Sequence, residues 1–164
     1  MNMVFSEEQR LLADTARDFL DAHCPVAALR RLRDGRDALG YDPEVWRQMV
    51  DLGWTAIPFP EALGGLDFGY SGMGAVFEQM GRTLAASPLF ATVVLGGSAL
   101  SLGGTPEQQA AHIGPIIAGD RRFALAVIDL DHFKHINDTL GHKGGDAALV
   151  HATRQMHLNL RETD

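Results

Sequence analysis

The sequence has one cysteine, no excess of basic residues and no long apolar run, and each absence excludes a class of protein. Cys24 stands alone, so no internal disulfide can form. Against 21 Asp and Glu there are 14 Lys and Arg, a net charge of −7 that disfavours nucleic acids and anionic membranes as partners. No apolar stretch approaches the roughly 20 residues that cross a bilayer, and no signal-peptide pattern opens the chain. We therefore expect a soluble, cytoplasmic protein without a nucleic-acid or membrane partner.

The composition is that of an ordinary globular chain. Hydrophobic residues make up 46% and charged residues 21% of the 164 positions, which is enough to form a core. A chain of this length accommodates one domain, or one domain and part of another. Two complete enzymes do not fit.

Helix signals dominate the first three quarters of the chain. Ser6-Glu7-Glu8-Gln9 is a capping box that opens an amphipathic run. Pro43 suits the first turn of a second helix, which Gly53 ends. The spacing of the apolar positions from 73 to 84 predicts a helix that buries one stripe, Met73, Val76, Phe77, Met80 and Leu84. Further helices are expected from about 89 to 102 and from Thr105-Pro106 onward.

The pattern changes at residue 123. Phe123 to Ile128 is a short apolar run, typical of a buried strand, and it ends in Asp129-Leu130-Asp131. A short helix to Leu140, a break at Gly141 and a longer helix from Asp146 to Leu160 are predicted to follow. A single strand cannot satisfy its own backbone groups, so this segment implies a sheet whose other strands are absent from the chain.

Residues 5 to about 125 resemble the N-terminal helical domain of acyl-CoA dehydrogenases. Five short segments carry the resemblance in family order: Phe5-Ser6-Glu7-Glu8-Gln9, Leu52-Gly53-Trp54, Pro60 to Gly65, Phe77-Glu78-Gln79-Met80-Gly81-Arg82, and His112 to Asp120. The resemblance implies FAD as the cofactor and acyl-CoA as the substrate. It also places Thr92, Leu95 and Ala99 at the deep end of the acyl cavity. Plain core packing explains these three residues equally well.

From Leu125 onward the chain resembles the opening of a GGDEF diguanylate cyclase domain. The resemblance rests on Asp129-Leu130-Asp131-His132-Phe133-Lys134, Asn137 to His142 and Gly145 to Leu149. It implies a Mg²⁺ site made by the Asp129 carboxylate and the Leu130 carbonyl. Backbone N–H groups at Phe133 and Lys134 would receive GTP phosphates, and Asn137 and Asp146 would pair with guanine.

The expected fold class is therefore mainly α, with two parts. Residues 1–124 form a helical bundle of acyl-CoA dehydrogenase type, and residues 125–164 form a truncated α/β strand-helix-helix segment, a partial GGDEF domain without its signature hairpin. We expect a composite without catalysis of its own, with FAD not bound and Mg²⁺ bound weakly. Two alternatives stay open: a nucleotide-binding regulatory module that retains partial GTP and Mg²⁺ recognition, and a flavoprotein subunit completed by a homo-oligomer or a partner chain.

Simpler interpretations apply to several of the polar residues. Asp129 and Asp131 could be surface carboxylates that cap the next helix. The five histidines between 132 and 157 lack cysteine partners, so we expect no zinc site. Glu78 is expected on a helix surface, and Cys24 is expected to be a small buried thiol.

Overall fold

The computed structural model describes residues 6–123 and 128–159, and the chain divides into two compact units, Met1–Leu125 and Ala126–Asp164. All regular structure in the described residues is helical, and they contain no strand. None of their helices is both long and apolar enough to cross a membrane. The mainly helical prediction is confirmed.

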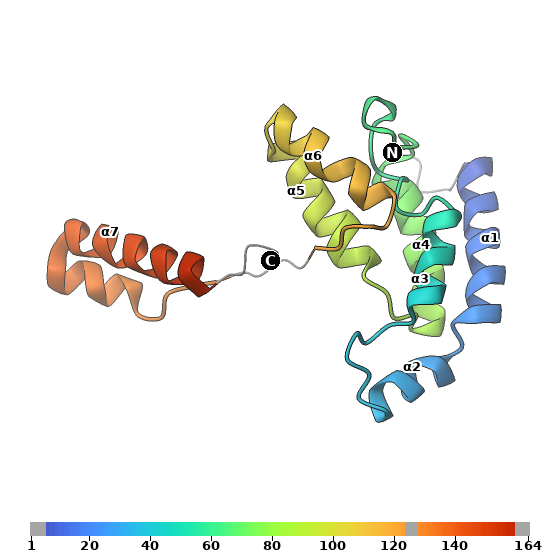
Figure 1. Ribbon diagram of the computed structural model, residues 1–164, viewed down its shortest axis with the longest axis horizontal. Helices are drawn as coiled ribbons and strands as arrows, with labels where there is room; N and C mark the ends of the chain where they lie inside the picture. Colours follow the sequence, from blue (N-terminus) through green and yellow to red (C-terminus); the bar gives the residue numbers. More distant parts are fainter. Residues whose placement is uncertain (1–5, 124–127, 160–164) are drawn as a thin grey trace. The chain divides into compact units, whose positions relative to one another are not determined.

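The first unit is a bundle of short helices (Figure 1). Its elements in chain order are α1 (Glu7–His23), α2 (Val26–Asp34), α3 (Pro43–Asp51), the 3₁₀ helix η1 (Glu61–Leu63), α4 (Gly69–Thr83), the π-helix η2 (Phe90–Gly97), α5 (Ser98–Gly103) and α6 (Pro106–Ile117).

The predicted helix starts are confirmed by their hydrogen bonds. Ser6 Oγ accepts from the Gln9 N–H at 3.2 Å, and the Ser6 N–H donates to Gln9 Oε1 at 3.0 Å, a complete capping box. Thr105 and Gln108 repeat this arrangement at α6. Asp42 caps α3 ahead of Pro43, accepting from the Glu44 N–H at 2.8 Å.

Helices α1 and α4 pack side by side and run in the same direction. Two side-chain hydrogen bonds join them, Gln9 to Ser71 and Arg17 to Gln79, and in each pair the two residues are 62 positions apart in the sequence. A constant offset requires parallel helices. The return path is made by α2, α3 and the loop that carries η1.

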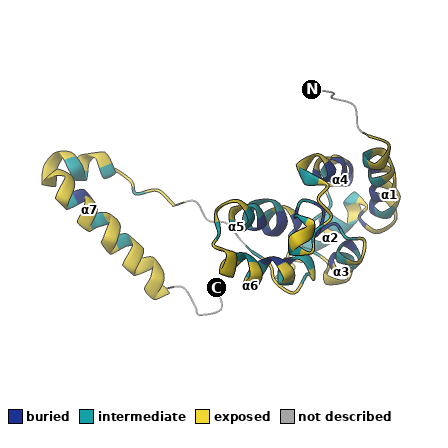
Figure 2. Cartoon of the chain, turned by 90° about the horizontal axis from the view of Figure 1, so that it is seen from above, coloured by how far each residue is buried: buried dark blue, intermediate teal, exposed yellow. Residues whose placement is uncertain are grey.

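The core of this unit forms where the loop after α3 enters the bundle. Figure 2 shows buried residues on the inner faces of α1, α3 and α4. The largest fully buried side chains include Trp54 and Phe59 from that loop, and the rest come mostly from the helices: Leu20, Met49, Met73, Leu89, Ile113 and Ile116. Gly65 lies against Phe59 so closely that an added Cβ would be 2.0 Å from the Phe59 carbonyl oxygen. The double glycine therefore closes the loop onto the core.

Three differences from the sequence prediction concern local structure. Helix α2 was not predicted. Leu84 is 55% exposed, because it ends α4 with a left-handed backbone (φ 55°) that turns it away from the stripe. The predicted strand falls mostly on residues 124–127, outside the described residues; its described ends, Phe123 and Ile128, are neither helix nor strand. The strand-helix-helix arrangement is not confirmed.

The described part of the second unit is a helical hairpin, α7 (Phe133–Asn159), interrupted at Gly141 (φ 69°, ψ 173°). The predicted break at this glycine is confirmed. Gly145 is buried where the helix after Gly141 contacts the helix before it, and a Cβ on Gly145 would be 1.9 Å from Asn137 Oδ1. Leu149 and Met156 were predicted to point inward, yet they are 45% and 36% exposed, because these described residues supply no second layer to cover them.

Candidate functional site

Thr92 is fully buried on the π-helix η2, and its hydroxyl is used inside the protein. Oγ1 accepts from the Phe123 N–H at 3.1 Å and lies 3.5 Å from the Phe123 carbonyl oxygen, to which it can donate. Thr92 thus holds the segment that leaves the first unit. Nothing in the sequence pattern signals this pairing, because the two residues are 31 positions apart.

Two glycines bring neighbouring rings against the same helix. A Cβ on Gly96 would be 2.7 Å from Phe123 Cβ, and one on Gly97 would be 2.5 Å from Phe59 Cζ. Helix η2 therefore packs between the Phe59 ring of the core and Phe123, which lies in the segment that follows α6 and is called the exit segment below. π-Helical turns are rare and often mark functional positions, so this element is the structurally most unusual part of the unit.

The other two predicted acyl-pocket residues lie farther along the same helical run. Leu95 is half-buried on η2, and Ala99 is exposed on α5. An apolar hollow of about 400 Å³ opens at the beginning of η2, lined by Phe77, Met80, Gly81, Leu84, Ala85, Ser87 and Phe90. The rings of Phe77 and Phe90 meet edge to face at 5.7 Å. None of the three predicted residues lines this hollow, and its Phe90 was not singled out from the sequence.

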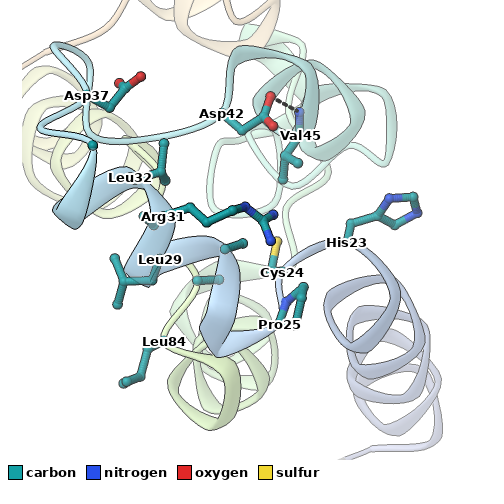
Figure 3. Close-up of a pocket in the computed structure, with 14 residues that line it drawn as sticks. His23, Cys24, Pro25, Leu29, Arg31, Leu32, Asp37, Asp42, Val45 and Leu84 are labelled. Carbon is teal, nitrogen blue, oxygen red and sulfur yellow. Dashed lines mark hydrogen bonds between the residues drawn. The ribbon is translucent and has the colours of Figure 1, made fainter.

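A second hollow, of about 240 Å³, lies between α2, the start of α3 and the end of α4 (Figure 3). Cys24 and Arg31 both line it. Burial raises the pKa of the Cys24 thiol, and the charge of Asp42 raises it further. A thiol of this kind stays protonated at neutral pH and is a weak nucleophile. Asp42, which also lines the hollow, is engaged in capping α3.

In the second unit, three of the predicted nucleotide and metal residues line one hollow. Asp129, Leu130 and Phe133 surround about 150 Å³ together with Ile128, Leu149, Ala152, Thr153 and Met156. Asn137 contacts Gly145, the residue before Asp146. Lys134 and Asp146 are exposed and line none of the hollows described here.

The Mg²⁺ implied by the resemblance finds part of a site here. The exposed Asp129 carboxylate and the Leu130 carbonyl are hard oxygen donors, which suit this ion. The Leu130 oxygen already accepts from the Phe133 N–H at 3.2 Å and keeps one lone pair. Among the described residues, no group of three or more His, Cys, Asp or Glu side chains gathers as a metal site. Asp129 and Leu130 would therefore supply two of the several oxygen donors that Mg²⁺ needs.

The first resemblance implies FAD as the cofactor, and whether this chain binds it stays a prediction. The buried polar side chains described in residues 6–123 are Thr55, Gln79, Thr83 and Thr92, all uncharged. No buried side-chain nitrogen or oxygen in the described chain lacks a hydrogen-bond partner.

Comparison with known proteins assigns both parts of the chain. Residues 6–120 match the family model "Acyl-CoA dehydrogenase, N-terminal domain", and residues 109–164 match "Diguanylate cyclase, GGDEF domain". The chain is 32% identical over 127 residues to acyl-CoA dehydrogenase FadE27 of Mycobacterium tuberculosis, covering 77% of this chain and 34% of that protein. It is 53% identical over 45 residues to the probable diguanylate cyclase DgcC of Escherichia coli, covering 27% of this chain and 12% of that protein.

The fold of the first unit is also found in solved structures. A chain of the ChsE4-ChsE5 complex from Mycobacterium tuberculosis superposes with a TM-score of 0.71 and 31% identity, covering 80% of this chain and 36% of that one. The chain thus spans about a third of the length of these dehydrogenase relatives. The chain belongs to the acyl-CoA dehydrogenase N-terminal domain family, with a shorter GGDEF-type segment joined to it.

Proposed function

We propose that residues 1–124 act as a binding domain of acyl-CoA dehydrogenase type, which supplies one wall of an acyl cavity and no catalytic group. The observation that carries this proposal is the uncharged character of every buried polar side chain in the described part of this unit. A general base or an activated nucleophile needs a titratable group held in a defined place. The only cysteine, Cys24, has a raised pKa, opposite to what activation requires.

The wall would be the run from η2 into α5, where Leu95 is half-buried and Ala99 is exposed. Apolar side chains on a rigid helix suit an acyl chain, which binds by burial of surface. Thr92 serves this wall indirectly, because its hydroxyl is engaged with Phe123.

A labelled side chain tests this assignment. Ala99→Cys, carrying an environment-sensitive fluorophore, should respond saturably to octanoyl-CoA and much less to CoA alone. Ala27→Cys, exposed on α2, is the matched control, and the native Cys24 is buried and reacts slowly. Equal fluorescence responses at positions 99 and 27 would contradict the assignment of α5 to the wall of the acyl cavity.

The same proposal predicts purified protein without flavin colour and without acyl-CoA-dependent dye reduction. A stoichiometric flavin absorbance band in the purified chain would contradict it. That result would support instead a flavoprotein subunit completed by further copies or by a partner chain.

We propose a second role for residues 125–164, partial recognition of a guanine nucleotide with Mg²⁺. The gathering of Asp129, Leu130 and Phe133 around one hollow favours it, as does the position of Asn137 beside Gly145. Asp129 and the Leu130 carbonyl would hold the ion, the amides near Lys134 would receive phosphate, and Asn137 with Asp146 would contact the base. We expect no cyclic diguanylate synthesis, since that reaction needs two nucleotides facing each other across a complete metal site.

Titration of the ¹⁵N-labelled chain with GTP and Mg²⁺ checks the second role. Saturable shifts confined to residues 128–156 are expected, and they should weaken in Asp129→Asn. Asp138→Asn, which removes an exposed carboxylate on α7, is the control. Shifts that are equal with ATP, or unchanged by Asp129→Asn, would refute guanine and metal recognition.

A further inference from the structure

Two arginines from different helices converge on one neutral oxygen in the first unit. Gln79 Oε1 accepts from Arg17 Nε on α1 at 3.3 Å and from Arg82 Nη1 on α4 at 3.1 Å. Gln79 is 4% exposed, while both arginines reach solvent. The parallel packing of α1 and α4 creates this convergence, since it places Arg17 level with Gln79.

The positive charge of this cluster is only partly balanced. Asp14 lies 3.2 Å from Arg17 Nη1, and both side chains are well exposed. The ion pairs found in residues 6–123 and 128–159 are Arg17–Asp14, Arg33–Asp34 and Arg47–Glu44, none of which includes Arg82. The cluster therefore carries two guanidinium charges and one carboxylate.

Donors remain available at the same point. Each guanidinium carries five N–H groups, and the recorded bonds use only a few of them. No bond from Gln79 Nε2 is found within the described part of the chain, and no buried side-chain nitrogen there lacks a partner, so this NH₂ group is not fully buried. Two guanidinium groups with unused donors thus lie next to the Gln79 amide.

We propose that Arg17, Arg82 and the Gln79 NH₂ form a binding site for an oxyanion, a phosphate or carboxylate group bridging the two arginines. The guanidinium fork matches both groups in geometry, and charge-assisted bonds to it are the strong ones. Gln79 preorganises the pair by holding both side chains in place, which reduces the ordering cost of binding. This site is separate from the acyl wall on η2 and α5.

NMR titration of the full-length chain with inorganic phosphate tests the site. The Gln79 side-chain NH₂ and the Arg17 and Arg82 Nε–H signals should shift saturably. Sodium chloride of equal ionic strength should produce no such shift. An acetate titration distinguishes the source of the oxyanion: tighter binding of phosphate indicates a phosphate ligand, and tighter binding of acetate indicates a carboxylate.

Variants separate anion binding from a purely structural tie between α1 and α4. Arg82→Gln should weaken phosphate binding by at least about tenfold, and Arg82→Lys should weaken it less, because the charge remains. Arg33→Gln, an exposed arginine on α2, should bind as the wild type does. Absence of saturable shifts in the wild type, or equal affinity in Arg82→Gln, would overturn the proposal. The wild-type titration alone decides the matter if Arg82→Gln does not fold.

Discussion

Thr92→Val removes the hydroxyl that joins η2 to the exit segment, and we expect it to destabilise the first unit by about 1–2 kcal/mol. Valine keeps the volume and the β-branch, so packing and backbone preference change little. What changes is the Phe123 N–H, which loses its 3.1 Å acceptor, and the Phe123 carbonyl, which loses a weaker donor at 3.5 Å.

The magnitude follows from the burial of the groups left unpaired. A fully buried unsatisfied group costs about 1–3 kcal/mol, but the residue that carries this amide, Phe123, is only half-buried. The bond at 3.5 Å is at the limit of hydrogen bonding and contributes little. The loss of one well-formed hydrogen bond to the amide of a half-buried residue is therefore expected to cost about 1–2 kcal/mol of unfolding free energy, the lower half of that range.

Urea unfolding followed by circular dichroism measures the effect, with an unchanged slope showing that only stability has moved. Thr15→Val is the matched control, since Thr15 Oγ1 donates only to the Leu11 carbonyl on an exposed helix face; its change should stay within about 0.5 kcal/mol. Thr92→Ser keeps the hydroxyl and should retain slow exchange of the Phe123 amide, which Thr92→Val should accelerate. Equal stability of Thr92→Val and Thr15→Val, with unaltered Phe123 exchange, would refute the role of this bond.

Three further predictions concern the rest of the chain. Gln109 Nε2 donates to three carbonyl oxygens at the end of α5, at 3.1–3.2 Å. Gln109→Glu should destabilise the packing of α5 and α6, because a carboxylate would repel these oxygens. A thermal midpoint equal to that of the wild type would contradict this. Gly65→Ala should lower the free energy of unfolding by at least about 1 kcal/mol, and by up to about 3 kcal/mol, since its Cβ would be 2.0 Å from the Phe59 carbonyl oxygen. Gly114 on α6 has open space around it, so Gly114→Ala should leave the free energy of unfolding unchanged or raise it by up to about 1 kcal/mol. Amide exchange should be slow in residues 6–120 and fast in residues 128–159 in dilute monomer, because the described residues of the second unit bury only Gly145. Exchange in 128–159 as slow as that of α4 would show one cooperative core.

The parts of the fold that were predictable from sequence depend on neighbours within one turn. The capping boxes at Ser6 and Thr105 and the proline at position 43 fix where helices begin, because the groups that satisfy the first N–H donors lie within three residues. The break in α7 at Gly141 has the same local origin, a positive φ that glycine adopts at low cost.

Predictions that extrapolated a periodic pattern were less accurate at its ends. Leu84 continues the spacing of the α4 stripe, but the backbone leaves the helix at that residue, and periodicity carries no information about a left-handed terminus. Helix α2 was missed because its start at Val26 follows Pro25 without a side-chain cap and it buries no residue fully. Its spacing therefore gave only a weak signal.

The roles of the site residues depend on contacts between residues far apart in sequence, and a local sequence pattern carries no information about such contacts. Thr92 was selected by resemblance as a residue of the acyl cavity, and that role stays a prediction. Its hydroxyl, however, meets Phe123, 31 residues away, and Arg17 meets Gln79, 62 residues away. A threonine or a glutamine on an apolar helix face has the same local pattern whether its polar atom awaits a ligand or satisfies a distant backbone group. Only the packing of η2 against the exit segment, and of α1 parallel to α4, separates the two cases: it engages the Thr92 hydroxyl with Phe123 and brings Arg17 to the Gln79 side-chain oxygen.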